Sequence, residues 1–444
     1  MKRFLLDSLL CTLFVFIFLF GLLKISDLKI FNAFDPLGKA LGDMELTDIA
    51  FSQFRDTDEL KVDTNVVIVN TGYLNRRQLT EQIATIIACK PRVIGTDIRF
   101  VCLHPSQDSI NCPQNYDTLT NLLLGSVTSA FPNFVHAEKI EQTDSLIRAL
   151  GDTDIYDSVS HSHPLVVQNS HEGFVNLETE AGHQEDLKTC RRFTPRIVVR
   201  GEEHLAFSVQ MAMLYDSVKT KRFLERGKTS EVINYRGNII DWFGAGDLSG
   251  RYQVLDVGQS LDTTQFLPSM LKDKIVIMGF LGENLFDTSW DDKFFTPLNK
   301  VYAGRARPDM YGVVVHANIV SMILNEDYVD ELPESLQYVI AFFLVFLNVM
   351  LFGWITRKIP VWFDSLSLTI QVLQVSLLVF LMIEAFNLFS FKLNLTGALA
   401  AIALVGTSFE LYTTVIKSLF KYLGEKIPWL TKRGQDVLTP ESSE

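Results

Sequence analysis

Four apolar segments, each close to the length that crosses a hydrocarbon core, constrain the fold of this 444-residue chain more than any other feature. One is at residues 4–23, and the other three are at 336–354, 363–386 and 393–416. About 20 apolar residues in a helix span a bilayer. The sequence therefore predicts an α-helical membrane bundle of four transmembrane helices, with a long polar segment at 24–332 between the first helix and the second.

The basic residues that flank these segments predict the orientation of the chain. Lys2 and Arg3 precede the first segment, Arg357 and Lys358 lie between the second and third, and Lys417 begins a basic stretch after the fourth. With four spans, all of these residues fall on one side, which the positive-inside rule identifies as the cytoplasm. The polar segment 24–332 is then expected to be extracytoplasmic.

The first apolar segment has two interpretations, a cleaved signal peptide or a retained anchor. The residues around 22–24 offer no small-residue cleavage site, and the apolar run is long, so we expect a retained anchor. The predicted organisation is an N-terminal signal anchor at 1–23, an extracytoplasmic domain at 24–332, three transmembrane helices at 333–416 and a short cytoplasmic tail at 417–444.

The polar segment has the pattern of a mixed α/β domain. A buried strand at 66–70, a helix at 77–89 and a second strand at 92–98 follow one another with short connections, which is typical of a parallel sheet. Later, 193–200 resembles a strand and 205–215 a buried helix, and 231–235 with 238–243 suggest a hairpin.

The last part of the polar segment reads as a strand, a loop and a helix. The continuous apolar run at 274–279 predicts a strand buried on both faces of a parallel sheet. Gly282, Asp287 and Pro297 mark an ordered loop, and Gly312 opens a segment with helical spacing of its apolar residues.

Composition excludes several classes of function. A net charge of −12 leaves no basic face for phosphates, so we expect no nucleic-acid partner. Five cysteines do not require a disulfide framework. The chain carries no nucleophile motif such as G-x-S-x-G and no phosphate-cradling glycine loop, so it predicts no catalytic residue and no cofactor.

Three residues of the polar segment form the candidate ligand site. Asp97 and Asp287 each follow a predicted parallel strand, and His316 lies in the helix after the loop. The carboxyl ends of parallel strands share one edge of a sheet, where a polar ligand or an ion often binds. The alternative is that both aspartates cap backbone N–H groups and that His316 packs against the sheet.

The histidines of the polar segment are a second set of candidate ligands. His161 and His163 alternate and could chelate Zn²⁺, but no third ligand follows at a diagnostic spacing, so we expect solvated loop histidines, His171 and His183 among them, and no metal site. The pair could also respond to acid pH.

Cys102 and Cys112 flank a short loop and are a possible disulfide in an oxidising compartment.

The last apolar segment carries small residues that favour close helix packing. Gly397 and Ala401 are four residues apart, as are Ala403 and Thr407. Glu410 follows one turn later, nominally within the membrane, where an acidic group is either functional or solvated near the headgroups.

The polar segment resembles the CHASE2 domain, an extracellular sensory module of bacterial signalling proteins. The motifs lie in the expected order over roughly residues 45–330 and are FSQFR at 51–55, VVIV at 66–69, VIGTD at 93–97, GFVN at 173–176, RRFTP at 191–195, KIVIMG at 274–279, TP at 296–297 and GV with HAN at 312–318.

Two departures from the family pattern bear on function. Asn70-Thr71-Gly72 stand where relatives often carry an acidic residue. Relatives also usually continue into a kinase, cyclase or other output domain, whereas the tail at 417–444 is too short for an independent core.

The resemblance implies a non-enzymatic sensor or scaffold in the bacterial cytoplasmic (inner) membrane, with the domain on the periplasmic side. We expect it to bind a ligand or envelope partner and to act through a separate membrane or cytoplasmic protein, with a homo-oligomer as a further possibility. A structural subunit of an envelope complex is the alternative. An envelope hydrolase using Asp97, Asp287 and His316 is a third.

Overall fold

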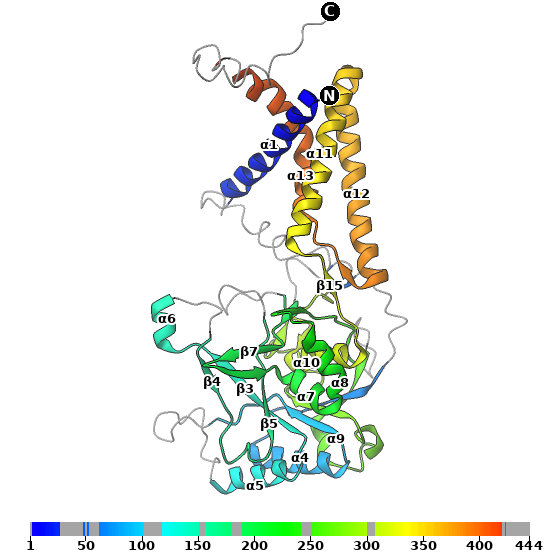
Figure 1. Ribbon diagram of the computed structural model, residues 1–444. Helices are drawn as coiled ribbons and strands as arrows, with labels where there is room; N and C mark the ends of the chain where they lie inside the picture. Colours follow the sequence, from blue (N-terminus) through cyan, green and yellow to red (C-terminus); the bar gives the residue numbers. More distant parts are fainter. Residues whose placement is uncertain are drawn as a thin grey trace, which may run out of the picture. The chain divides into compact units, whose positions relative to one another are not determined.

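A computed structural model describes residues 2–26, 48, 51–52, 62–101, 118–150, 156–178, 189–240, 250–299, 307–419 and 422 (Figure 1). The chain forms two compact units. One unit is Phe51–Val329, and the other combines Met1–Ala50 with Asp330–Glu444. Each unit is described separately below.

The unit Phe51–Val329 is built around an eight-stranded sheet (Figure 1). Its strands are, in spatial order, β10 (Asn238–Ile239), β11 (Gly250–Leu255), β1 (Asp63–Asn70), β12 (Ile275–Gly279), β2 (Val93–Thr96), β3 (Phe134–Glu141) and β4 (Ser158–Ser160), while β5 (His171–Phe174) also pairs with β3. The β3–β4 pair is antiparallel, and the other pairs of this sheet are parallel. This is the mixed, mainly parallel α/β architecture predicted from the sequence.

The central strands form because their side chains are apolar on both faces. Every residue of β12 is buried, as are Val66, Val67, Ile68 and Val69 of β1. Val276 of β12 pairs with Val67 on one side and with Ile94 of β2 on the other. The strand predicted at 274–279 is therefore the interior strand of the sheet, covered by helices on both faces.

Helices cover the two faces of this sheet. On one side, α4 (Arg76–Ala88) and α5 (Thr118–Ser129) bury Leu79, Ile83, Ile86 and Leu124 against β1, β2, β3 and β12, and α9 (Val257–Leu261) packs beside α4. On the other side lie α7 (Phe207–Tyr215) and α10 (Gly312–Asn325), with α8 (Ser217–Glu225) packed against both. A capping box between Asn75 and Gln78 fixes the start of α4.

Smaller elements complete the unit, and one of them corrects a prediction. They are α6 (Asp144–Leu150), η3 (Pro268–Met270), β6 (Arg192–Phe193), β7 (Arg196–Val199), β8 (Glu202–Leu205), β9 (Glu231–Val232), β13 (Lys293–Phe294) and β14 (Met310–Tyr311). The strands predicted at 231–235 and 238–243 do not pair with each other within the described residues, which end here at 240. Instead, β9 pairs antiparallel with β6 and β10 pairs parallel with β11, so long-range pairing replaces the local turn.

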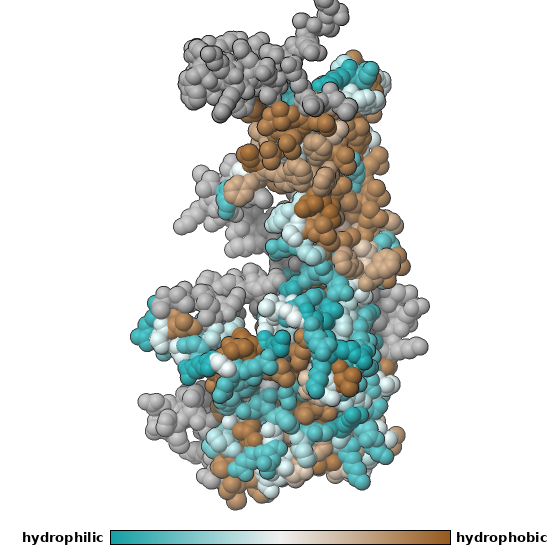
Figure 2. All heavy atoms as spheres, viewed as in Figure 1, coloured by the Kyte–Doolittle hydropathy of each residue, from teal (hydrophilic) through white to brown (hydrophobic). Residues whose placement is uncertain are grey.

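The second unit contains the four predicted spans. They are α1 (Lys2–Ser26), α11 (Glu334–Lys358), α12 (Phe363–Phe389) and α13 (Thr396–Leu411), which a π-helical turn, η5 (Tyr412–Ile416), continues. A 3-10 turn, η4 (Pro360–Trp362), joins α11 to α12. All four are long and apolar enough to cross a membrane. Figure 2 shows that apolar side chains dominate the surface of these helices, as expected of a lipid-facing surface.

Packing of α13 against its neighbours uses a face different from the predicted one. Of the four small residues, Ala401 is buried, whereas Gly397, Ala403 and Thr407 are exposed. Residues 401 and 403 lie on nearly opposite sides of a helix, so the predicted set does not share one face. The buried face consists of Ala398, Ala401, Ile402, Val405, Gly406, Ser408 and Phe409.

Polar contacts also join these helices. Gln371 of α12 donates from Nε2 to the carbonyls of Ile402 and Ala403, 2.8 and 3.0 Å away, beside Gly406. Asp7 of α1 accepts hydrogen bonds from Lys417 Nζ at 2.6 Å and from the Tyr412 hydroxyl at 3.1 Å. The acidic residue of the first span is thus paired, which reduces the free energy required to hold it there.

Glu410 is exposed and lies beside Asp364 in the first turn of α12. Glu410 is therefore level with the start of α12, where Asp364 closely follows the basic residues Arg357 and Lys358 in the sequence, rather than midway along the helices. This position favours the solvated interpretation over a functional one.

Candidate functional site

The carboxyl ends of β1, β12 and β2 meet at one edge of the sheet, as expected of adjacent parallel strands. Asn70, Gly279 and Asp97 occupy these ends, and the Asp97 amide donates to the Met278 carbonyl at 2.8 Å. A Cβ on Gly279 would lie 3.3 Å from that of Asp97 and 3.0 Å from Val313. The edge is thus closely packed against the start of α10.

The structure brings Asp97 and His316 together. His316 Nε2 lies 3.9 Å from Asp97 Oδ2, and the side chains are 3% and 14% exposed. On the other side of the ring, Nδ1 forms a 2.8 Å hydrogen bond with the Ser208 hydroxyl of α7. The Phe207 ring packs against the imidazole edge-on. His316 therefore links α10 to α7 and presents its second nitrogen to the carboxyl.

Burial holds both groups of this pair in their neutral forms. It lowers the pKa of the His316 imidazole to about 3. Burial, with a smaller contribution from the Asp292 charge, raises the pKa of the Asp97 carboxyl to about 8. Desolvation disfavours whichever form is charged, which explains the opposite directions. Asp292 is an exposed residue near this pair, and its backbone carbonyl accepts a hydrogen bond from the Gly312 amide at the start of α10.

Asp287 does not join this pair and instead shapes its own loop. Its carboxylate accepts from the backbone amides of Glu283 and Ser289 at 2.9 and 2.8 Å. These bonds lower the pKa of Asp287. The loop turns back on itself at Gly282, whose φ is +89°. The capping alternative therefore describes Asp287, and of the three residues expected at the candidate site the structure brings only Asp97 and His316 together.

The side-chain amide of Asn70 organises this edge of the sheet. The amide donates to Asp256 Oδ1 at 2.9 Å and to the Gly282 carbonyl at 3.2 Å. Its oxygen accepts from the backbone amides of Gly72 and Leu281, both at 2.9 Å. An amide can both donate and accept, whereas a carboxylate only accepts, so the contact with Asp256 requires asparagine here.

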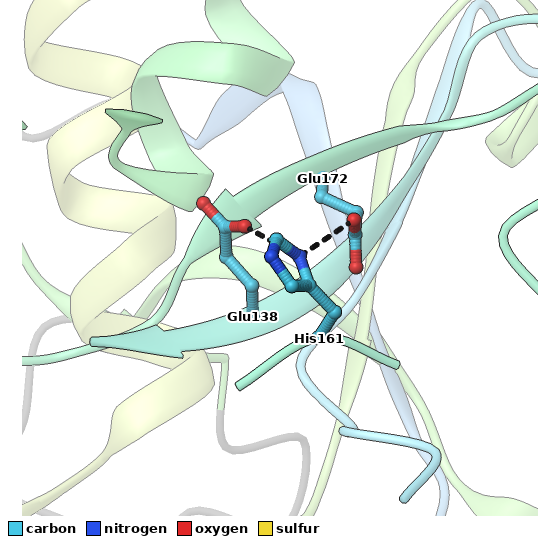
Figure 3. A group of neighbouring side chains, drawn as sticks. All are labelled: Glu138, His161 and Glu172. Carbon is cyan, nitrogen blue, oxygen red and sulfur yellow. Dashed lines mark hydrogen bonds and ion pairs between the residues drawn. The ribbon is translucent and has the colours of Figure 1, made fainter. Parts of the chain in front are cut away.

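A second group of polar side chains lies at the far end of the sheet (Figure 3). His161 follows β4, and its Nδ1 lies 3.2 Å from Glu138 Oε2 of β3 and 3.0 Å from Glu172 Oε2 of β5. The other oxygen of Glu138 is 3.0 Å from Nδ1 of His204 in β8. Burial raises the pKa of Glu138, while the hydrogen bond from His204 opposes the rise. These residues have the donor types of a metal site.

His161, which the sequence singles out together with His163, contacts Glu138 and Glu172 instead. His163 turns away, and its Nδ1 accepts from the Leu165 amide. Glu138 and Glu172 come from strands whose pairing brings distant residues together. The sequence does not predict a strand at 134–141, because His136, Glu138 and Lys139 interrupt its apolar pattern. A period-two alternation from Phe134 to Ile140 was not present to signal it.

The cysteine and histidine predictions have mixed outcomes. Cys102, Cys112 and His183 lie outside the described residues, so the possible disulfide stays a prediction. Cys89 and Cys190 are buried cysteines of the α/β unit. His171 is exposed at the start of β5.

Together, an α/β domain with a closely packed carboxyl edge and four apolar helices define a membrane protein with a large polar domain. A family model of the CHASE2 domain matches residues 12–355. The chain belongs to the CHASE2 family, whose domains are sensory domains of an extracellular type. The match exceeds the 45–330 expected from motifs, since it begins within α1 and ends within α11. No curated protein and no solved structure matches this chain.

Proposed function

We propose that this protein is a non-enzymatic sensor of the bacterial cytoplasmic membrane, with its α/β domain on the periplasmic side. In this proposal the domain binds a ligand or envelope partner, and the helices pass the change to a separate membrane or cytoplasmic protein. The observation that supports it most is the family match, which runs without interruption from the first apolar helix through the domain into the second.

The distribution of charge supports the proposed orientation. Lys2, Arg357, Lys358 and Lys417 all flank the same ends of the four helices. The positive-inside rule places those ends in the cytoplasm and the α/β domain outside.

A short strand pair offers a route for the signal. After Val329 the chain forms β15 (Asp330–Glu331), which pairs with β16 (Phe391–Lys392) between α12 and α13. The Asp330 amide donates to Ser390 and the Leu332 amide to Lys392, and Lys392 Nζ lies 3.5 Å from Glu331. The segment that enters α11 is therefore bonded to the turn that precedes α13. A displacement of this segment would act on both helices.

Partner capture tests the proposal. The full chain is extracted with its native lipid, cross-linked and analysed by mass spectrometry, with the wild type compared to Asp330→Pro, which removes the amide bonded to Ser390. We expect a reproducible membrane or cytoplasmic partner whose recovery changes in the variant. Recovery of no stable partner would count against the proposal.

A structural subunit of an envelope complex is the competing function. It predicts a partner whose recovery is the same with and without every ligand tried, and no thermal stabilisation of the full chain across a panel of metabolites and ions. A ligand that both stabilises the chain and changes partner recovery distinguishes the sensor.

A further inference from the structure

Two carboxylates and two imidazoles from separate segments of the chain lie together in the group Glu138, His161, Glu172 and His204. Glu138 is 3% exposed, His204 12%, Glu172 23% and His161 50%. The order of exposure runs from a buried carboxylate to a half-exposed imidazole. The group is therefore fixed at its base and open to solvent at His161.

Two carboxylate oxygens lie within hydrogen-bond distance of His161 Nδ1, which can donate a hydrogen bond well to only one of them. Nδ1 carries at most one hydrogen, yet it faces carboxylate oxygens of two residues at 3.2 and 3.0 Å. One hydrogen points well at only one of them. The remaining contact brings lone pairs of two electronegative atoms together. Two neighbouring carboxylates add like-charge repulsion, which a bound cation would relieve.

The geometry points to a binding site for a divalent transition-metal ion, such as Zn²⁺, held by Glu138, His161 and Glu172. We propose this site as the ligand site of the sensory domain. Its role as an input signal rests on the proposed sensor function, whereas the binding itself does not.

The distances fit such an ion. The donor atoms of the three residues all lie within 4.8 Å of one another. Metal–ligand bonds of about 2.0–2.1 Å in a tetrahedral site separate the donor atoms by roughly 3.3 Å. The observed separations of 3.0 and 3.2 Å require only a small expansion. One imidazole with two carboxylates suits Zn²⁺ or Mn²⁺ better than a soft, thiolate-seeking ion.

The surroundings assign supporting roles. His204 contacts the second oxygen of Glu138, and the Ser162 amide donates to the second oxygen of Glu172 at 3.2 Å. Such outer contacts orient metal-binding carboxylates. Three protein ligands leave a coordination position for water, and the exposure of His161 gives the ion a path in and out. An exchangeable ion suits sensing better than a purely structural role.

Isothermal titration with ZnCl2 tests the site directly. The full chain, in lipid nanodiscs, with its affinity tag removed and after treatment with a chelator, is titrated as wild type and as the variants Glu172→Gln and His161→Ala. We expect one ion per wild-type chain at this site and an affinity at least about 10–100-fold weaker in both variants. His204→Ala should weaken binding less than either.

Matched controls separate this site from adventitious binding. His171→Ala removes an exposed histidine next to Glu172, and Glu203→Gln removes an exposed carboxylate next to His204. Both should bind Zn²⁺ like the wild type. Circular dichroism of each variant checks that it is folded.

Two results would overturn the site: no saturable binding of Zn²⁺ or Mn²⁺ by the wild type, or an equal loss of affinity in His171→Ala. Neither result depends on a partner, so the capture experiment above stands or fails separately. Zinc binding without any change in partner recovery would support the site and overturn its role as the input signal.

Discussion

Replacing Asn70 tests how the carboxyl edge of the sheet is held together. The amide of this fully buried side chain joins the end of β1 to the loop after β12 and to Asp256 at the start of α9. Asn70→Ala removes the acceptor of the Gly72 and Leu281 amides. It also removes one of the donors to Asp256 Oδ1, which still accepts from the Val257 amide.

The size of the effect follows from what becomes unsatisfied. A buried N–H without a partner costs about 1–3 kcal/mol. Leu281 is buried and bears that cost in full, whereas Gly72 is partly exposed and can recover a bond to water. We therefore expect a loss of about 2–4 kcal/mol. At roughly 2 °C per kcal/mol for a domain of this size, the melting temperature falls by about 4–8 °C.

Near-ultraviolet circular dichroism of the full chain in detergent measures the melting temperature of the α/β unit, and hydrogen exchange reports on the Leu281 amide. Asn70→Asp should also destabilise, because it sets a second carboxylate against Asp256. Combining it with Asp256→Asn restores one donor and one acceptor and should recover much of the loss. An Asn70→Ala variant with the wild-type melting temperature and an unchanged Leu281 exchange rate would show that the Asn70 hydrogen bonds do not stabilise this edge.

Three further predictions follow from the buried pair and the helices. Burial lowers the pKa of His316 to about 3, so as pH falls from about 6.5 to about 3 the unfolded chain binds a proton that the folded chain does not. By pH 5 this difference lowers the free energy of unfolding by about 2 kcal/mol. His316→Asn should therefore reduce the loss of melting temperature between pH 7 and pH 5. Burial raises the pKa of Asp97 to about 8, so the destabilising contribution of its carboxyl grows from about pH 4 to pH 8. Asp97→Asn should therefore melt at a higher temperature than the wild type at pH 8.5 but not at pH 4. A higher melting temperature at both pH values would contradict this assignment of the pKa. Gly406→Ala places a Cβ 2.7 Å from the Gln371 amide oxygen and should weaken disulfide cross-linking between cysteines introduced in α12 and α13, whereas Gly397→Ala, with no atom within 4 Å, should not.

The features predicted best from the sequence were those with uniform chemistry along the chain. The run KIVIMG at 274–279 has one environment throughout, a sheet interior, so composition alone identified β12. The four spans are similarly uniform, and the structure contains all four. The helix after Gly312 was also predicted, although α10 is buried on every side and not on one face only.

The misses share a physical cause, which is pairing between distant residues. β3 mixes buried apolar residues with His136 and Glu138, and the partners of Glu138 come from β8 and from the segment after β4. β10 pairs with β11 and not with its neighbour in sequence. The position of Asp97 at the end of a strand could be predicted because the strand itself could be. Asp287 lies in a loop whose own backbone amides bond its carboxylate.

Labelling of single introduced cysteines tests whether the α/β unit is extracytoplasmic and is anchored by four membrane spans. With the native thiols replaced by serine, a cysteine is placed at exposed Tyr73 of the α/β unit or at exposed Trp362 between α11 and α12. Intact cells made permeable only in their outer membrane are treated with a membrane-impermeant maleimide. With the α/β unit outside the cytoplasmic membrane, we expect labelling at position 73 without lysis and labelling at position 362 only after lysis. The reverse pattern, or labelling of both positions in intact cells, would contradict it.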